Sequence, residues 1–357
     1  MIHAAPPRSA SLGPMIEIDG SFGEGGGAIL RQALALAAYA GRSVRLFRIR
    51  AGREQPGMKP QHLKAVEAVA AITGARVEGA AIRSTELVFE PGPLRSGSYR
   101  FDVGTAGAAT LVLQSLLLPC LCRAGEFELM VVGGTDVSWS PPADHLRSVT
   151  LPALAHFGAA QLTVLRRGYY PKGGGRLETR LVGGAGPHAP LSLVESGGLT
   201  AVRGVSHAAR MLAPRRVAER QAEAARQALA PLGLPVDIAL QYAEAYSVGS
   251  GITLWTLAPS GASLGASALG ARGKRAEDVG REAAHALQGE IASGAAVDRH
   301  LADQLIPFLA VSGGCLVTSE VTGHARSNIY VSERVLGAAF EVEGRRVTAR
   351  AVTPVPA

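Results

Sequence analysis

MIEIDGSFGEGGGAILRQALALAAYA, residues 15–40, predicts a strand, a glycine-rich turn and a helix in direct succession. Residues 15–19 alternate apolar and polar side chains, as a half-buried strand does. Residues 27–40 carry apolar side chains on more than one side, which indicates a buried helix.

A second strand and a second helix follow, and two short strands close the unit. Residues 43–49 predict a strand, and residues 60–73 form an amphipathic helical pattern that ends at Gly74. Short strands are expected at 75–80 and 86–90. The first part of the chain therefore predicts the element order βαβαββ.

The same order of elements returns later in the chain. A second copy is expected at 99–103, 106–118, 127–132, 143–157 (a helix ended by Gly158), 161–165 and 176–181. A third, weaker copy is expected at 190–195, 301–312, 316–320, 324–336, 339–343 and 346–351.

Residues 196–297 interrupt the third copy and have a pattern of their own. Strands are expected near 200–206, 236–241 and 252–257, with helices near 214–229 and 276–293. This is enough for a separate α/β domain of about 100 residues.

We therefore predict an α/β protein of the α+β type, with three βαβαββ repeats around a shared pseudo-threefold axis and a smaller α/β domain inserted. The repeats would occupy residues 15–195 and 298–357, the inserted domain residues 196–297, and a disordered extension residues 1–14. Clefts between repeats and domains are natural ligand sites.

Composition narrows the classes of function. The 357 residues include 36 Lys and Arg against 29 Asp and Glu, and a net charge of +7 favours an anionic partner such as nucleic acid or nucleotide. Aromatic residues, at 5%, argue against a base-stacking platform of many rings, and three cysteines make neither a disulfide framework nor a four-ligand zinc site.

The longest apolar run, 110–122, is too short to span a bilayer, and residues 1–14 lack a signal peptide's apolar core. We expect a cytoplasmic protein with no membrane partner.

The glycine-rich loop, residues 23–28, allows three interpretations. It fits the loose G-x-G-x-x-G/A pattern of dinucleotide folds, but the next strand ends Arg48-Ile49-Arg50 and lacks the acid that would bind a ribose. The glycines could make only a tight turn, or they could bind an anion at the start of the helix. A carboxylate beside phosphate needs a bridging cation, so Glu24 is a candidate ligand for Mg²⁺ or Mn²⁺.

Arg31, at an otherwise apolar helix position, needs either a salt bridge or a phosphate contact.

The remaining candidate site residues lie at two polar helix starts and in one conformationally restricted loop. His324 lies in a first helical turn, whose positive end disfavours the imidazolium and attracts phosphoryl groups, so the ring would be neutral and nucleophilic near pH 7. A surface or capping histidine is the plainer interpretation. Residues 300–304 (HLADQ) open the preceding helix. Residues 133–144, which contain Pro141 and Pro142, form either a structural loop or one wall of a nucleotide pocket, with Asp144 or a neighbour capping the next helix.

Seven segments, taken in chain order, resemble the RNA 3′-terminal phosphate cyclase family. They are DGSFGEGGGAILR (19–31), IRAGREQPGMKPQHL (49–63), GTAGAATLVLQSLLL (104–118), GGTDVSWSPPADHL (133–146), GYYPKGGG (168–175), HLADQ (300–304) and GHARSNIYVSERVL (323–336). They are spread along nearly the whole chain and together are far more specific than any one glycine loop. The family's fold, three βαβαββ repeats with a small inserted α/β domain, agrees with the organisation predicted above.

The resemblance implies a three-step reaction that uses ATP and RNA 3′-phosphate ends. ATP transfers AMP to a histidine nitrogen and releases pyrophosphate, and the AMP then passes to the RNA 3′-phosphate. The neighbouring 2′-hydroxyl attacks the activated phosphorus, expels AMP and leaves a 2′,3′-cyclic phosphate. Adenylation creates a good leaving group, and the hydroxyl on the same ribose has a high effective concentration.

The resemblance also assigns roles by motif. His324 matches the adenylated nucleophile and Glu24 the metal-linked carboxylate, while Pro141 and His300 would sandwich the adenine, position 300 being one where relatives can carry Tyr. The ATP site would further include Arg31, Gln114, Leu301, Ala302, Asp303 and Gln304. Contacts with the phosphates or the RNA end are implied for Arg50, Arg53 and Gln61.

Two alternatives come from other functional classes. A non-catalytic relative that binds RNA in ribosome assembly would lack the nucleophilic histidine, and His324 argues against it. An enolpyruvyl transferase has related repeats but would turn over phosphoenolpyruvate without ATP. The physiological RNA, the preferred metal, the terminal base and the oligomeric state, a homodimer included, stay open.

Overall fold

Three of the four sheets in the computed structural model, which describes residues 14–184 and 186–352, share one topology. Their orders are β1-β2-β4-β3, β5-β6-β8-β7 and β9-β14-β16-β15. In each, the first two strands are parallel and the remaining pairs are antiparallel. The three βαβαββ repeats predicted from the sequence are therefore confirmed. The extension expected at 1–14 lies, apart from Pro14, outside the described residues.

Each repeat runs through its strands and helices in the same order. The first repeat contains β1 (Ile16–Asp19), α1 (Gly27–Ala40), β2 (Val44–Phe47), α2 (Pro60–Thr73), β3 (Arg76–Glu78) and β4 (Leu87–Glu90). The second contains β5 (Gly97–Asp102), α3 (Ala109–Leu121), β6 (Gly125–Gly133), α4 (Ala143–His145), a π-helical turn (Leu146–Thr150), α5 (Leu151–Ala153), β7 (Gly158–Arg166) and β8 (Gly175–Gly183). The third contains β9 (Leu191–Leu193), α8 (Arg299–Ser312), β14 (Gly314–Val317), α9 (Gly323–Leu336), β15 (Ala339–Glu343) and β16 (Arg346–Arg350).

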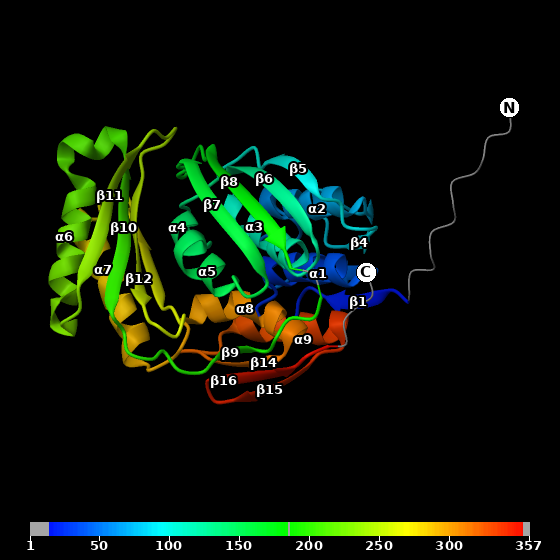
Figure 1. Ribbon diagram of the computed structural model, residues 1–357. Coiled ribbons are helices and arrows are strands. Elements are labelled where there is room, and N and C mark those ends of the chain that lie inside the picture. The colour runs from blue at the N-terminus through cyan, green and yellow to red at the C-terminus, as the bar shows by residue number, and fades with distance from the viewer. Residues whose placement is uncertain (1–13, 185, 353–357) are drawn as a thin grey trace.

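The fourth sheet belongs to the inserted segment. It contains β10 (Ala201–Ala209), α6 (Val217–Leu229), β11 (Val236–Ala243), β12 (Ser250–Leu257), β13 (Gly265–Leu269) and α7 (Ala276–Ala292), with short 3₁₀ helices at Arg210–Arg215 and Ala230–Leu232. Its strand order is β11-β10-β12-β13. In Figure 1, α6 and α7 lie on the side of this sheet that faces away from the repeats.

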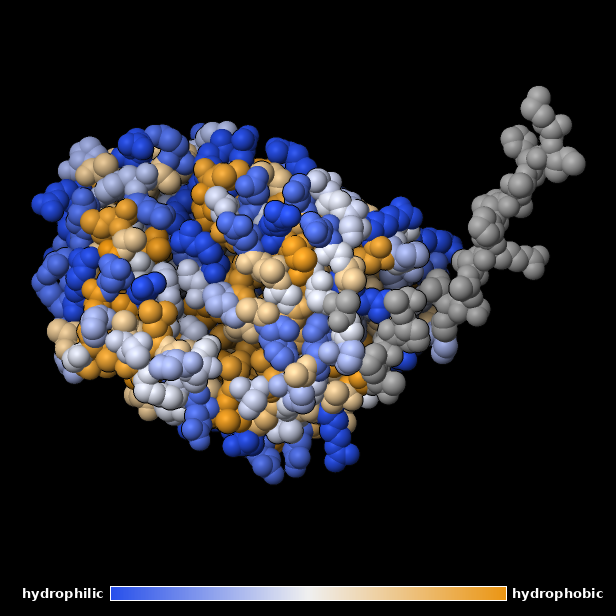
Figure 2. All heavy atoms as spheres, viewed as in Figure 1, coloured by the Kyte–Doolittle hydropathy of each residue, from blue (hydrophilic) through white to orange (hydrophobic). Residues whose placement is uncertain are grey.

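Buried apolar side chains form two large cores. One is shared by the three repeats and extends from Ile18 to Ala349, and the other lies within the inserted segment. Two cores are what two domains require, and the boundaries at 195/196 and 297/298 stay a prediction. Across the described residues, no helix is both long and apolar enough to cross a membrane. Hydrophilic and hydrophobic side chains are interspersed over the face seen in Figure 2.

Two local expectations were wrong. The helix predicted over 143–157 widens into the π-helical turn and ends at Ala153, because Pro152 has no N–H to continue the regular hydrogen bonds, and Gly158 begins β7 instead. No strand was expected at β13, whose small residues GASAL carry little strand propensity.

Candidate active site

The glycine-rich loop of the first repeat packs against the beginning of α9 in the third repeat. Phe22 stacks on Tyr330 with 4.1 Å between ring centroids. Nearly two turns nearer the helix start, Glu24 Oε2 lies 3.4 Å from Nε2 of His324. A Cβ at position 323 would collide with Glu24 Oε1, so Gly323 allows the carboxylate to approach the helix. Two motifs that lie far apart in the sequence therefore form one surface.

The His324 imidazole is half-buried in the first turn of α9. Burial is the largest influence on its pKa and lowers it, Arg31 and Arg53 lower it further, and Glu24 acts in the opposite direction. The ring is therefore neutral at pH 7, with burial rather than the helix start as the main cause. Arg53 Nη2 lies 3.4 Å from Glu24 Oε2, so carboxylate, imidazole and guanidinium form one cluster.

Arg31 is partly buried in α1, and burial lowers its pKa to about 10. Within residues 14–184 and 186–352 it makes no hydrogen bond or ion pair, so the salt-bridge interpretation lacks a partner there. The start of α1 lies alongside: Gly26 occupies the N-cap and no side chain caps the helix. Unpaired N–H groups beside an unpaired guanidinium make a site suited to an anion.

His62 was not singled out from the sequence, although it belongs to this site. It is buried, its Nδ1 accepts from the Lys59 amide at 3.1 Å, and a Cβ at Gly27 would collide with its Nε2. Burial, reinforced by Arg31 and Arg50, lowers its pKa to about 3. The neutral ring therefore carries its proton on Nε2, facing the start of α1.

The two other residues predicted at the RNA end hold loops in place. Arg50 is buried, and its Nη1 donates to the carbonyls of Gln55 at 2.7 Å and Gly57 at 2.6 Å. Gln61 Oε1 accepts from the Ala108 amide at 2.9 Å, which joins α2 to the loop before α3. Their contact with substrate stays a prediction.

Hydrogen bonds join α8 to the start of α9 and to the middle of α3. Thr322 caps α9, and its hydroxyl donates to Asp303 Oδ1 at 2.6 Å. Gln304 Oε1 accepts from Gln114 Nε2 at 2.6 Å and from the hydroxyl of Thr150, a residue that sequence reasoning missed, at 3.0 Å. Gln114 of α3 and Gln304 of α8, both predicted at the ATP site, therefore contact each other. Asp303, next to Gln304, contacts Thr322 at the beginning of α9.

The other predicted ATP-site residues differ in their exposure. The side chains of Leu301 and Ala302 are buried in the core, so only their backbone could contact a nucleotide. His300 is exposed and Pro141 half-buried. Asp298, which sequence reasoning missed, is fully buried and caps α8 through Oδ1, which accepts from the His300 and Leu301 amides at 2.9 Å.

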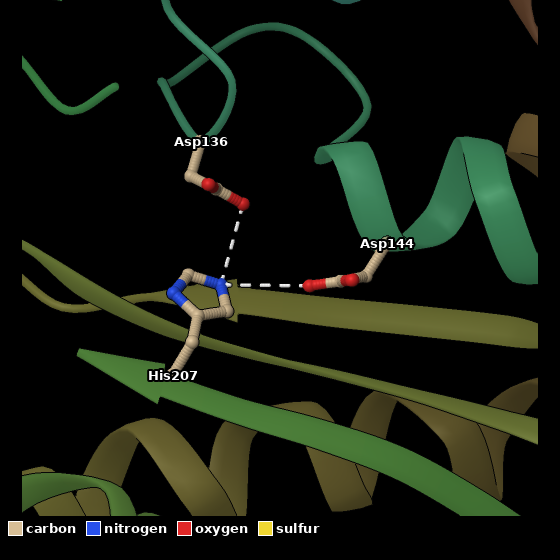
Figure 3. A group of neighbouring side chains, drawn as sticks. All are labelled: Asp136, Asp144 and His207. Carbon is tan, nitrogen blue, oxygen red and sulfur yellow. Dashed lines mark ion pairs between the residues drawn. The ribbon is translucent and has the colours of Figure 1, made fainter. Parts of the chain in front are cut away.

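A buried cluster joins the second repeat to the inserted segment. Asp136 and Asp144, from the loop and helix after β6, face His207 of β10 (Figure 3). The three groups could hold a cation, but Arg167 already lies 3.2 Å from Asp136 Oδ2 and 2.7 Å from Asp144 Oδ2. Burial alone would raise the pKa of Asp136, yet His207 and Arg167 outweigh it and lower it.

Of the expected caps for the helix after the loop, Asp144 or a neighbour, the structure excludes Asp144. The N-cap is Pro142, and Asp144 instead accepts hydrogen bonds from Arg147 and Arg167. The two aspartates of the stiff loop therefore anchor it against the inserted segment.

Comparisons with known proteins agree with this arrangement. A family model described as RNA 3′-terminal phosphate cyclase matches residues 22–342. A protein of that name from Archaeoglobus fulgidus is 50% identical, over 93% of this chain and 99% of its own length. Proteins of the same name from Methanothermobacter thermautotrophicus and Pyrococcus furiosus are 48% and 46% identical, over 93% and 92% of this chain and 97% and 96% of their own. The chain belongs to the RNA 3′-terminal phosphate cyclase family.

Proposed function

We propose that this protein converts an RNA 3′-terminal phosphate into a 2′,3′-cyclic phosphate, with ATP as the second substrate and AMP carried covalently on His324. The observation that carries the proposal is the neutral His324 imidazole beside the Arg31 guanidinium and the start of α1, which, among the described residues, have no ion-pair partner and no side-chain cap respectively. A nucleophile and an anion site lie together there, as nucleotidyl transfer to a side chain requires.

The first step forms a bond between a ring nitrogen of His324 and the α-phosphorus of ATP, and breaks the bond from that phosphorus to pyrophosphate. A neutral imidazole has one nitrogen with a free lone pair, so the low pKa of the ring keeps it ready for attack. The RNA 3′-phosphate then takes AMP from the histidine. In the last step the 2′-hydroxyl oxygen bonds to the terminal phosphorus, AMP leaves, and the hydroxyl proton is released.

The side chains suggest where each part of ATP binds. Arg31, Arg53 and the Nε2–H of His62 offer donors to the phosphates around the start of α1. Gln114 and Gln304 are hydrogen-bonded to each other next to Asp303 in the chain, and the nucleoside would bind there, with His300 and Pro141 about the adenine as the family resemblance implies. Any contribution of Leu301 and Ala302 comes from their backbone.

A divalent cation fits at Glu24. Its carboxylate is 42% exposed, supplies the hard oxygen that Mg²⁺ or Mn²⁺ prefers, and lies beside the nucleophile. Magnesium is commonly held by one or two carboxylates together with substrate phosphates. When bound, the ion would neutralise phosphate charge, while Glu24 itself orients the His324 ring. The cytoplasmic location also stays a prediction.

The test uses an end-labelled oligoribonucleotide with a 3′-phosphate, incubated with the protein, ATP and Mg²⁺ or Mn²⁺. We expect a product whose terminal phosphate resists phosphatase, formed only when ATP is present. An oligonucleotide with a 2′-deoxy terminal sugar is the matched control, because it can be adenylated but cannot cyclise. Phosphatase-resistant product formed without ATP, or resistant product from the 2′-deoxy control that carries no AMP, would contradict the proposal.

A further inference from the structure

Two of the seven tyrosines expose their rings where the second repeat meets the inserted segment. Tyr170, in the turn between β7 and β8, is 76% exposed, and Tyr246, in the loop between β11 and β12, is 54% exposed. Exposed rings are suited to stacking on nucleic acid bases, and two rings can serve two bases without a large aromatic platform.

The Tyr246 ring is fixed in place although it is exposed. The guanidinium of Arg166 lies 4.0 Å from the ring centroid, and its Nη1 donates to the Tyr246 hydroxyl at 2.5 Å. A Cβ at Gly174 would lie 2.6 Å from Tyr246 Cδ2, so only glycine allows the ring to lie against this turn. A ring already ordered loses little conformational entropy when a base stacks beside it.

The turn that carries Tyr170 is connected on both sides. The Lys172 amide donates to Ser247 Oγ of the inserted segment at 3.1 Å. On its other side, a Cβ at Gly173 would lie 2.7 Å from Ala106 Cα, so the turn packs closely on the loop before α3. That loop ends at the hydrogen bond to Gln61, which is predicted to contact the RNA end. Connected loops therefore lead from the predicted position of the 3′ end to both rings.

Cations accompany the rings. Lys172 is exposed, and its ammonium pairs with no carboxylate within the described part of the chain. Arg166 faces Tyr246 and also forms no ion pair there, its partners being Gly174 and the tyrosine. The nearby carboxylate of Glu244 is paired with Arg210. Two cations without carboxylate partners, beside two exposed rings, complement a single-stranded polyanion with unstacked bases.

We propose that Tyr170, Tyr246, Arg166 and Lys172 bind the RNA strand upstream of its 3′ end, with bases stacked on the two rings and the backbone phosphates beside the two cations. The proposal rests on the proposed function and on the predicted contact of Gln61 with the RNA end. Recognition by stacking and charge does not depend on sequence, so this surface selects single-stranded ends of any base composition.

The test measures fluorescence anisotropy with 5′-labelled RNAs that carry a 3′-phosphate and are 2 or 10 nucleotides long. For the wild-type protein we expect tighter binding of the longer RNA. The Tyr170→Ala/Tyr246→Ala variant should bind the long RNA roughly thirty-fold or more weakly, the low end of what losing two base–aromatic stacks costs, and the short RNA unchanged. Lys172→Ala should reduce the slope of log affinity against log salt by about one.

Matched variants separate this role from a structural one. Tyr170→Phe/Tyr246→Phe keeps the rings and should bind the long RNA as the wild type does. Arg180→Ala removes an exposed cation toward the other end of β8 and should leave affinity unchanged. The proposal would be overturned if the double alanine variant kept its melting temperature and bound the long RNA as tightly as the wild type. A variant with a changed oligomeric state and intact RNA binding would overturn it as well.

AMP labelling without RNA keeps the two proposals distinguishable. The double alanine variant should be labelled by ATP as fast as the wild type, because neither ring lies in the His324 cluster. A wild type that is labelled, combined with unchanged RNA binding by the variant, refutes the RNA surface alone. A wild type that is never labelled and never cyclises RNA refutes the proposed function as well.

Discussion

Burial decides which single residues of the candidate site carry charge. It lowers the pKa of the His324 imidazole and raises that of the Asp303 carboxyl to about 7, because each charged form loses its hydration. The hydroxyl of Thr322, which caps the helix of His324, donates to Asp303. Thr322 therefore links the helix that carries the neutral His324 imidazole to Asp303, whose carboxyl has a pKa near neutrality.

Asp303→Asn should flatten the dependence of stability on pH. The carboxyl has a higher pKa in the folded protein than its ordinary 3.8, so its stabilising contribution is fully present below about pH 4 and is lost as the pH rises through about 7. The difference corresponds to at most about 4 kcal/mol, at roughly 1.4 kcal/mol per pKa unit. Asparagine can still accept from Thr322 and does not titrate.

The melting temperature of the wild type should therefore fall relative to that of Asp303→Asn between pH 5 and pH 8, as followed by differential scanning fluorimetry. Parallel curves over that range would show that Asp303 is ionised throughout and would contradict the account of its burial.

The residues predicted from the sequence differ in how well local patterns could identify them. Glu24 and His324 stand out because a carboxylate in a glycine loop and a histidine at a helix start are locally unusual. His62 could not be chosen in the same way, because its role depends on contact with Gly27, across two elements. The unpaired state of Arg31 is likewise a property of its surroundings in the fold, which no local pattern records.

At the scale of elements, the approach of the glycine loop to α9 depends on one position without a side chain. Gly323→Ala adds a methyl group that collides with the Glu24 carboxylate, whose flexible end can move aside. We therefore expect the fold to be kept, and the rate of AMP labelling to fall roughly ten- to hundred-fold because the carboxylate is misplaced.

Gly289→Ala in α7 is the matched control, because no atom lies within 4 Å of the added Cβ. It should stabilise the protein by roughly 0.5–1 kcal/mol in urea unfolding, as alanine does inside helices, without altering the labelling rate. Equal labelling by Gly323→Ala and the wild type would remove Glu24 from the account.

Helices were predicted best where their side-chain pattern and end signals agree. The bounds of α1 and α2 match the expectation, because apolar periodicity runs up to Gly41 and Gly74, which adopt the left-handed conformation typical of helix ends. The expected helix over 143–157 was wrong at its end, because the backbone hydrogen bonds beyond Leu154 join residues three apart, Ala155 to Pro152 and Phe157 to Leu154, while the apolar periodicity continues.

At the scale of the whole molecule, the buried cluster around Arg167 fixes the inserted segment to the second repeat. Its side chains come from four separate places: the loop after β6, α4, the end of β7 and β10. The repeats themselves were predictable because each one repeats a local pattern. This junction was not, because no local pattern links residues so far apart in the chain.

Arg167→Leu should destabilise the protein by about 3–5 kcal/mol, since two buried aspartates would lose their cation. Arg180→Leu, which breaks an exposed pair with Glu126, should change stability by at most about 1 kcal/mol. Urea unfolding of both variants measures the difference. A chelator should not lower the wild-type melting temperature, because Arg167 and not a metal ion balances the cluster. An effect of Arg167→Leu no larger than that of Arg180→Leu would contradict this.

The central claim is that His324 carries AMP, and covalent labelling tests it most directly. The protein is incubated with α-labelled ATP and Mg²⁺ or Mn²⁺ and then separated on a denaturing gel, alongside His324→Ala and a control, His285→Ala, that changes an exposed histidine of α7. The account predicts an acid-labile, alkali-stable labelled band in the wild type and in His285→Ala, and none in His324→Ala. A labelled His324→Ala protein, or an unlabelled but folded wild type, would contradict it.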